Sequence, residues 1–246
     1  MIKEKIALVT GGAGGIGEAI CIRLLNDGYK VVAAYQNKEK AEAWQLRQKE
    51  AGLKIEIVHC QVTDFEACGK AVKWVEDNVG MIDILVNNAG ITKDGAFKKM
   101  TPERWDAVID TNLNSVFNMT RQVFEGMVAR GFGRIINISS VNGQMGQFGQ
   151  CNYTAAKAGM HGFTKSLARE IARKGVTVNT LSPGYVSTPM VMAIAEDVRK
   201  KIEDGIPLGR LCQAEEIAHG VSYLASDLAA YVTGSELDIN GGLFMH

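Results

Sequence analysis

Seven short runs of apolar, often β-branched residues alternate with longer segments of helical periodicity along this chain. We predict strands at residues 6–9, 31–34, 55–59, 82–86, 134–139, 176–181 and 236–239. The first four runs are too apolar to face water on either side, which is typical of parallel strands covered by helices on both faces. The alternation therefore predicts an α/β fold built on one doubly wound parallel sheet of seven strands.

Helical segments connect these strands. Helices are predicted at residues 16–27, 39–51, 64–79, 101–130, 153–173, 190–203 and 214–224. Thr101 and Pro102 suit the N-cap and the first position of the long fourth helix. No Pro/Ser-rich stretch or charge block divides the chain, so we predict a single domain over residues 1–246, with an excursion for the substrate at about 184–210.

Charge and composition narrow the set of partners. Lys and Arg total 27, as do Asp and Glu, so no global field attracts nucleic acid or an anionic membrane. No apolar run could span a membrane and the first residues lack a signal-peptide core, so we expect a cytoplasmic protein. The five cysteines and four histidines lack ligand spacing, and no metal site is predicted. Among the histidines, His161 is the one to check, because it lies on helix 153–173.

A glycine-rich turn, Thr10-Gly11-Gly12-Ala13-Gly14-Gly15-Ile16-Gly17, directly follows the first predicted strand. Such a turn aims backbone N–H groups of a helix N-terminus at the pyrophosphate of a dinucleotide. We expect Gly11 to close the turn, Gly15 to let the backbone approach phosphate, and Gly17 to let the helix pack on the sheet. The turn alone is equally compatible with a purely structural connection between strand and helix.

Two further segments follow predicted strands. Asn87-Asn88-Ala89-Gly90 ends the fourth strand, at the sheet edge where open α/β proteins bind ligands, although Asn87 suits a bridge between strand ends as well. The second strand ends without the carboxylate that would bind a ribose 2′-hydroxyl, and Lys38 follows it. This favours NADP(H) over NAD, with Lys38 pairing with the 2′-phosphate. The alternative is that Lys38 is a solvated loop residue.

Tyr153 and Lys157 lie one helical turn apart on a predicted helix. A free tyrosine has a pKa near ~10, and we expect the fixed cation of Lys157 to lower it so that Tyr153 donates a proton in a reduction. Ser140, or its neighbour Ser139, is placed after the fifth strand to hydrogen-bond the reacting carbonyl.

With these motifs in order, the chain resembles the short-chain dehydrogenase/reductase family over nearly its whole length. The matching segments are Thr10-Gly11 to Gly17, Asn87 to Gly90, Asn112, Ser140, Tyr153-x-x-x-Lys157 and Pro183-Gly184-x-x-x-Thr188. The resemblance implies a Rossmann-like fold, an enzyme that uses a nicotinamide cofactor, and a homotetramer. The resemblance also implies that Ser140, not Ser139, is the catalytic serine. It implies that Asn112 holds a water molecule that links Lys157 to solvent, and that Lys157 binds the nicotinamide ribose.

The resemblance assigns the remaining cofactor contacts too. The predicted cofactor-binding residues are Gly11, Gly12, Ala13, Gly15, Ile16, Gly17, Lys38, Gln61, Val62, Asn88, Ala89, Gly90, Tyr153, Lys157, Pro183, Gly184, Val186 and Thr188. Gln61 and Val62 would contact adenine, although the family commonly has Asp-Val where this chain has Gln61-Val62.

Between Ser140 and Tyr153 lies a glycine-punctuated segment that we expect to overhang the active site. It is similar to that of family members that reduce 3-oxoacyl-CoA thioesters. The substrate contacts that this implies are Asp94, Ser140, Gln147, Phe148, Gln150 and Tyr185. An acyl-carrier-protein thioester, docked by Arg130 and Arg173, is the alternative substrate. A non-catalytic NADP-binding regulator is a different class, which the complete Ser, Tyr and Lys set disfavours.

Overall fold

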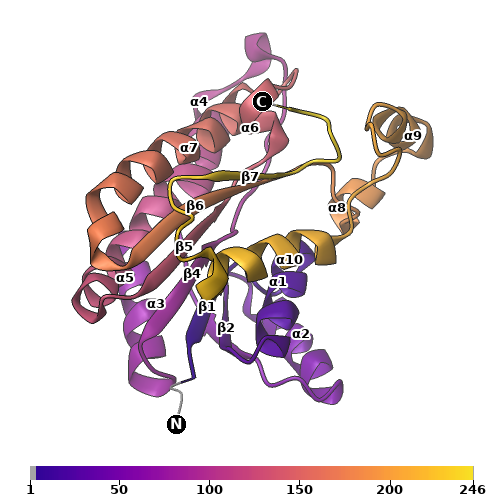
Figure 1. The fold of residues 1–246 in the computed structure, drawn as a ribbon. Helices are drawn as coiled ribbons and strands as arrows, with labels where there is room; N and C mark the ends of the chain where they lie inside the picture. Colours follow the sequence, from indigo (N-terminus) through magenta and orange to yellow (C-terminus); the bar gives the residue numbers. More distant parts are fainter. Residues whose placement is uncertain (1–3, 246) are drawn as a thin grey trace.

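The computed structural model describes residues 4–245 and confirms the predicted sheet of seven parallel strands (Figure 1). The strands are β1 Ile6–Thr10, β2 Lys30–Tyr35, β3 Glu56–His59, β4 Ile82–Asn87, β5 Gly133–Ile138, β6 Val176–Pro183 and β7 Glu236–Ile239. Their order across the sheet is β3-β2-β1-β4-β5-β6-β7. The first three residues of the chain and His246, both part of the predictions above, lie outside the described residues.

The chain first builds outward from β1 through β2 to β3 and then returns to place β4 on the other side of β1. The order of the strands therefore reverses between β1 and β4. In open α/β sheets the ligand binds at such a reversal, outside the carboxyl ends of the strands. The topology thus directs attention to the residues that follow β1 and β4.

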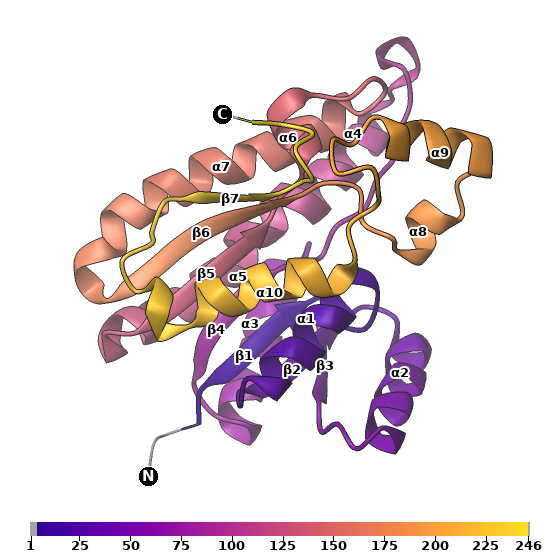
Figure 2. The same cartoon turned by 45° about the vertical axis from the view of Figure 1, so that its right-hand side comes forward.

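Two layers of helices cover the two faces of the sheet (Figures 1 and 2). One layer holds α1 Gly15–Asn26, α2 Lys38–Glu50 and α10 Ala214–Ala225, and the other holds α3 Phe65–Asn78, α5 Ser115–Arg130 and α7 Cys151–Ile171. Side chains of β1 alternate between the layers, because Ala7 and Val9 pack with the first and Ile6 and Leu8 with the second. This alternation makes two hydrophobic cores on one sheet.

One edge of the sheet departs from the prediction that the first four strands are buried on both faces. In β3, Glu56 and His59 are exposed and Ile57 is half-buried, and all four residues of β7 are half-buried. Both strands lie at the ends of the strand order and have a neighbour on one side only. The prediction was therefore wrong for β3.

The long helix predicted at residues 101–130 is interrupted. Helix α4 Pro102–Ile109 begins at Thr101, whose Oγ1 accepts from the N–H of Arg104 at 3.4 Å, as the N-cap prediction requires. A π-helical turn, Asp110–Asn114, separates α4 from α5. A wide turn of this kind rotates the following side chains relative to a regular helix, and such turns are frequent at functional sites. Here the fully buried side chain is Asn112.

Shorter helices complete the chain. They are α6 Val141–Met145, α8 Pro189–Met192, α9 Glu196–Asp204, and the 3₁₀ turns Phe97–Lys99, Ala172–Lys174 and Asp227–Ala229. Helices α8 and α9 lie within residues 184–210 and stand beside the carboxyl edge of the sheet (Figure 1). Of the helices in residues 4–245, none is both long and apolar enough to cross a membrane.

Candidate active site

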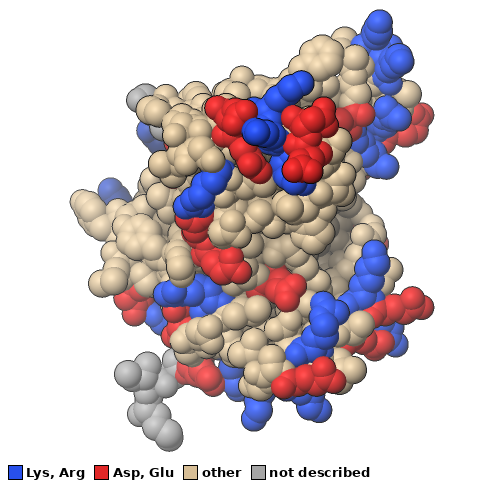
Figure 3. Space-filling view, turned by 90° about the vertical axis from the view of Figure 1, so that its right-hand side faces the viewer, with Lys and Arg blue, Asp and Glu red and all other residues tan. Residues whose placement is uncertain are grey.

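A cavity of about 700 Å³ opens at the carboxyl edge of the sheet, against the residues that follow β1, β4, β5 and β6. Of the predicted cofactor and catalytic residues, its wall includes Gly11, Gly15, Ile16, Asn88, Ala89, Gly90, Ser140, Tyr153, Lys157, Pro183, Gly184, Val186 and Thr188. Segments far apart in sequence thus meet at the reversal of strand order. On the face that bears α8 and α9, acidic and basic side chains are interspersed (Figure 3).

The glycine turn has the geometry that its sequence predicts. Gly11 and Gly15 have φ angles of 62° and 54°, a left-handed conformation that favours glycine. A Cβ on Gly17 would lie 2.2 Å from the carbonyl oxygen of Gly11, so only glycine lets the first turn of α1 approach the end of β1. The neighbouring Gly14 is open, since a Cβ there would meet no atom within 4 Å. A bare backbone at a helix N-terminus fits a dinucleotide pyrophosphate.

Of the turn residues predicted to bind the cofactor, Gly12, Ala13 and Gly17 do not line the cavity. A Cβ on Gly12 would lie 2.8 Å from Cβ of Ala33 and 2.9 Å from Sγ of Cys21, so Gly12 packs against β2 and α1. Ala13 packs against the core on the same face. Gly12 and Ala13 therefore pack behind the turn and the backbone at Gly14 lines the cavity, and both Gly12 and Ala13 remain predicted cofactor contacts.

Asn88 fastens the end of β4 to the end of β1. Its Nδ2 donates to the carbonyl oxygens of Thr10 and Gly11 at 2.9 and 3.2 Å, and Oγ1 of Thr10 accepts from the N–H groups of Asn88 and Ala89, both at 3.0 Å. Asn87 instead donates to Oδ1 of Asn137 on β5 at 2.8 Å. The bridging alternative for Asn87 is therefore the one that the structure supports.

The four predicted catalytic residues converge from three elements. Tyr153 and Lys157 lie in the first half of α7, and Ser140 caps α6 directly after β5, its Oγ accepting from the N–H of Asn142 at 3.2 Å. Nζ of Lys157 lies 5.6 Å from the ring centre of Tyr153. Asn112 lies behind the wall of the cavity, where its side chain both accepts from and donates to the backbone of Ile91, at 2.8 and 2.9 Å.

Burial sets the protonation of Lys157. Its side chain is enclosed and donates to the carbonyl oxygen of Ile138 at 2.7 Å, an uncharged acceptor. Removal of the ammonium group from water lowers the pKa of Lys157 to about 7. At neutral pH this lysine is therefore poised between its charged and neutral forms, which suits a group that passes protons.

Tyr153 departs from the expectation that Lys157 lowers its pKa. Burial raises the pKa of the Tyr153 phenol, a hydrogen bond with Ser140 partly offsets this effect, and the carboxylate of Asp94 adds to it. The expected lowering is therefore not produced by the protein groups alone. In its own environment Tyr153 is a protonated phenol that is hydrogen-bonded to Ser140, which is the form that donates a proton.

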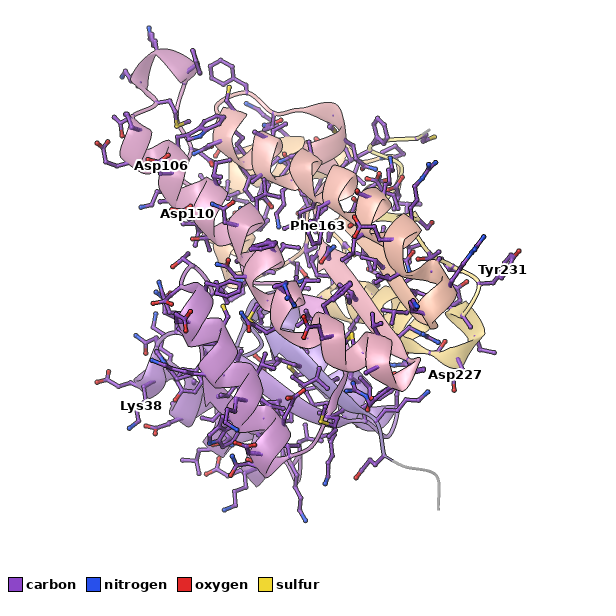
Figure 4. All side chains as sticks on the ribbon, turned by 90° about the vertical axis from the view of Figure 1, so that its left-hand side faces the viewer. Lys38, Asp106, Asp110, Phe163, Asp227 and Tyr231 are labelled. Atoms are coloured by element: carbon purple, nitrogen blue, oxygen red, sulfur yellow. The ribbon has the colours of Figure 1, made fainter. Side chains whose placement is uncertain are left out.

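The predicted contacts at the adenosine end lie away from the cavity. Lys38 begins α2, its side chain is 72% exposed, and Nζ lies 3.8 Å from a carboxylate oxygen of Glu42. Figure 4 shows it at the outer edge of the molecule. The side-chain amide of Gln61 donates to Oγ1 of Thr63 at 2.8 Å, and Val62 is half-buried beside it. These three residues remain predicted contacts.

The substrate residues divide into two groups. Asp94, Gln150 and Tyr185 line the cavity, and Nε2 of Gln150 donates to Oδ2 of Asp94 at 2.8 Å. Gln147 and Phe148 do not line it, and Phe148 is 89% exposed to solvent. The structure therefore supports the first group as wall residues and leaves the second outside.

Several wall residues were missed. They are Gly14, Ile91, Thr92, Ile138, Ser139, Val141, Asn142, Pro189, Val191 and Ile194. Eight of these ten lie within a recognised motif or within two residues of one, so chain proximity was the available signal. Val191 and Ile194 come from the excursion and have no distinguishing pattern. Asn142 donates to Oε1 of Gln150 at 2.9 Å and so supports the predicted substrate residue.

Comparison with known proteins agrees with this geometry. A family model described as short chain dehydrogenase matches residues 5–199. The chain is 57% identical to an acetoacetyl-CoA reductase of Allochromatium vinosum over 244 residues, covering 98% of this chain and 99% of that protein. It is 54% identical to an acetoacetyl-CoA reductase of Cupriavidus necator over 243 residues, with the same coverage. It is 45% identical to a 3-oxoacyl-[acyl-carrier-protein] reductase of Vibrio harveyi over 244 residues, covering 99% of both chains. The chain belongs to the short chain dehydrogenase family.

Proposed function

We propose that this protein reduces acetoacetyl-CoA to (R)-3-hydroxybutanoyl-CoA with NADPH and thereby supplies polyhydroxyalkanoate synthesis. The observation that carries the proposal is the convergence of Ser140, Tyr153 and Lys157 on one cavity beside the glycine turn. The identity of 57% to an acetoacetyl-CoA reductase over nearly the whole chain supports the choice of substrate.

Ser140, Tyr153 and Lys157 each have a separate role in the reduction of a ketone. NADPH supplies the hydride when it is bound. Ser140 donates a hydrogen bond to the substrate carbonyl and so stabilises the oxygen as negative charge develops on it. Tyr153, protonated in its buried environment, transfers its phenolic proton to that oxygen. Lys157, with a pKa of about 7, then returns a proton toward Tyr153.

The preference for NADPH over NADH rests on the end of β2. No carboxylate ends this strand, whose last residue is Tyr35, and Asn37 uses its side chain to cap α2 by accepting from the N–H of Lys40 at 2.9 Å. Lys38 is exposed, and within the described residues its Nζ has one ionic contact, at 3.8 Å from Glu42, so it can pair with a 2′-phosphate. Steady-state kinetics with both cofactors test this point, and a higher kcat/KM with NADH would contradict it.

An acyl-carrier-protein thioester remains the second candidate substrate. The arginines predicted to dock a carrier lie at the wrong edge of the sheet for this role. Arg130 donates to the carbonyl oxygen of Ile82, the first residue of β4, and Arg173 precedes β6. Both are therefore at the amino edge, whereas the cavity opens at the carboxyl edge. The site thus offers no particular support for a carrier.

Turnover of two matched thioesters decides between these substrates. Acetoacetyl-CoA and acetoacetyl-acyl carrier protein would be compared by the rate of NADPH oxidation, and chiral analysis of the product would establish its configuration. We expect a higher kcat/KM for the CoA thioester and the (R) product. A strong preference for the carrier thioester would overturn the proposed substrate and leave the proposed reduction intact.

We also propose that the protein acts in the cytoplasm as a homotetramer. Phe65 of α3 and Phe117 of α5 stack with ring centres 6.1 Å apart, and their exposed fractions are 41% and 51%. A pair of exposed aromatic rings on adjacent helices is typical of a surface that a second protein copy covers.

A further inference from the structure

Beneath the catalytic pair, three polar side chains form a chain of contacts that no step above uses. Nε2 of His161 lies 3.0 Å from Oγ of Ser139, and Nδ1 lies 2.9 Å from Oε1 of Glu236. His161 comes one helical turn after Lys157 on α7, Ser139 follows β5, and Glu236 begins β7 (Figure 2). The contacts therefore join three elements around the catalytic helix.

Ser139 and Glu236, at the two ends of this series of contacts, each contact one further group. Oγ of Ser139 also lies 3.0 Å from the backbone carbonyl oxygen of Lys157, within hydrogen-bond distance, and Oγ of Ser182 on β6 donates to Oε1 of Glu236 at 3.0 Å. His161 and Glu236 have side chains that are only 11% and 13% exposed. Ser139 directly precedes Ser140, so the chain of contacts touches the backbone of two catalytic residues.

Which atom donates in these contacts depends on whether His161 is charged. A carboxylate oxygen 2.9 Å from Nδ1 favours a proton on that nitrogen, although the contact does not meet the geometry of a hydrogen bond. When His161 is neutral, Nε2 therefore carries no proton and accepts a hydrogen bond from the Ser139 hydroxyl. In charged His161, Nε2 donates to Oγ of Ser139, whose proton turns to the carbonyl of Lys157.

The order of carboxylate, imidazole and hydroxyl matches that of serine hydrolases. Ser139 is only 4% exposed, however, and its Oγ is held beneath α7 by the carbonyl of Lys157. A nucleophile must reach a bound carbonyl carbon, and this hydroxyl is already engaged with the helix. The geometry therefore indicates a positioning role.

We propose that Glu236, His161 and Ser139 form a positioning relay that ties α7 to the end of β5 beside Ser140 through the hydrogen bond between Oγ of Ser139 and Nε2 of His161, and that its neutral state is the one competent for catalysis. Protonation of His161 turns the Ser139 hydroxyl proton toward the carbonyl oxygen of Lys157. It also places a second positive charge near the Lys157 ammonium group, which disfavours the charged form of that lysine. This inference rests on the proposed function of Ser140 and Lys157.

The surroundings of His161 define how the relay responds to pH. Burial lowers the pKa of His161, Glu236 and Asp238 on β7 raise it, and Lys165 and Lys157 on α7 lower it. The net direction is downward, so neutral His161 prevails at neutral pH and the charged form appears only as the solution becomes acidic. Activity should therefore fall on the acid side as His161 gains its proton.

Two variants should shift the pKa of His161 in opposite directions. Glu236→Gln removes an anion beside His161 and should move the acid limb of kcat to lower pH. Lys165→Gln removes a cation from an exposed position on the same helix and should move that limb to higher pH, without changing kcat at its plateau. Because Glu236→Gln also weakens a contact of the relay, we expect its plateau kcat to fall about threefold to tenfold.

The titration of His161 is read separately by NMR of protein labelled with ¹³C at histidine Cε1, with the His161→Gln spectrum identifying the resonance. We expect the acid limb of kcat to follow the His161 resonance in both variants, and NADPH affinity by fluorescence to be unchanged. If the resonance moves and the acid limb does not, the relay does not reach the catalytic residues and the inference is wrong.

The two proposals fail in different ways. The NMR titration needs no substrate, so an unshifted His161 resonance in Glu236→Gln would contradict the relay whatever the enzyme reduces. Lack of acetoacetyl-CoA turnover by the unaltered protein would contradict only the proposed substrate. The pH profiles would then be measured with the acyl-carrier thioester.

Discussion

Lys157 places its ammonium group where the side chain is 3% exposed and where its hydrogen-bond acceptor, the carbonyl of Ile138, carries no charge. Sequence spacing placed Lys157 beside Tyr153 correctly, since two residues four apart share a helix face whatever the fold. It did not give the electrostatics. The expected lowering of the Tyr153 pKa treats Lys157 as a fixed cation, whereas burial brings the pKa of Lys157 itself to about 7. How much a group is buried depends on the whole fold and cannot be predicted from the spacing of residues within one helix.

Replacing Tyr153 by Phe removes the proton donor and keeps the ring. We expect kcat to fall by about 10²- to 10⁴-fold, because general acid catalysis contributes about that much. NADPH affinity should change little, since the glycine turn and Asn88 are untouched. Turnover by absorbance and NADPH binding by fluorescence measure the two effects. Retention of about a tenth of the activity or more would refute the assignment of Tyr153 as proton donor.

Lys157→Met tests the cost of burying the ammonium group. The pKa of Lys157 is lowered in the folded protein, so the unfolded chain binds more protons between pH about 7 and ~10, and wild-type stability gains from rising pH there. The variant lacks this penalty. We expect it to be more stable than wild type below pH 7, on the order of a few kcal/mol, with the difference shrinking as pH rises toward ~10.

Denaturant unfolding at several pH values, without cofactor, measures this difference. Lys165→Met, on the exposed side of the same helix, controls for the loss of a lysine. A Lys157→Met protein that is less stable than wild type at every pH would show that its hydrogen bond to Ile138 outweighs the cost of burial.

At the scale of elements, periodicity predicted all seven strands, because each is a local apolar run between turn residues. What periodicity lacks is the neighbours of each element. It could not show that β3 is an edge strand, since that depends on the order of the sheet. It also could not show the π-helical turn at Asp110–Asn114, which is accompanied by hydrogen bonds between Asn112 and the distant Ile91. The family motif supplied Asn112 without its structural cause.

The contact between the glycine turn and α1 leads to a prediction at the same scale. Gly17→Ala would place a Cβ 2.2 Å from the carbonyl oxygen of Gly11, so helix and strand must move apart. We expect a loss of about 1–3 kcal/mol in unfolding free energy, typical of overpacking, and weaker NADPH binding. Gly14→Ala is the matched control for stability, because its Cβ would meet open space. Equal stability of the two variants would contradict this account of Gly17.

At the scale of the whole molecule, both the proposed chemistry and the proposed assembly depend on which surfaces the fold leaves open. The cavity lies at the carboxyl edge of the sheet, and the stacked Phe65 and Phe117 lie on the helical layer of α3 and α5. Sequence motifs located the cavity well, because the loops after β1 and β4 carry recognisable patterns. They did not locate the exposed aromatic pair, since an apolar residue on a helix is expected to face the core.

Phe117→Glu tests the proposed assembly through this pair. A carboxylate in place of a half-exposed ring would be buried without a partner wherever a second copy covers α5, and burial of an unpaired charge is strongly unfavourable. We expect the variant to dissociate into smaller species that keep the fold, as measured by light scattering after gel filtration and by circular dichroism. Leu46→Glu, which changes an exposed residue of α2 on the opposite helical layer, should leave the assembly intact. If Phe117→Glu keeps the mass of the wild-type protein, the face formed by α3 and α5 is not the surface through which the copies associate.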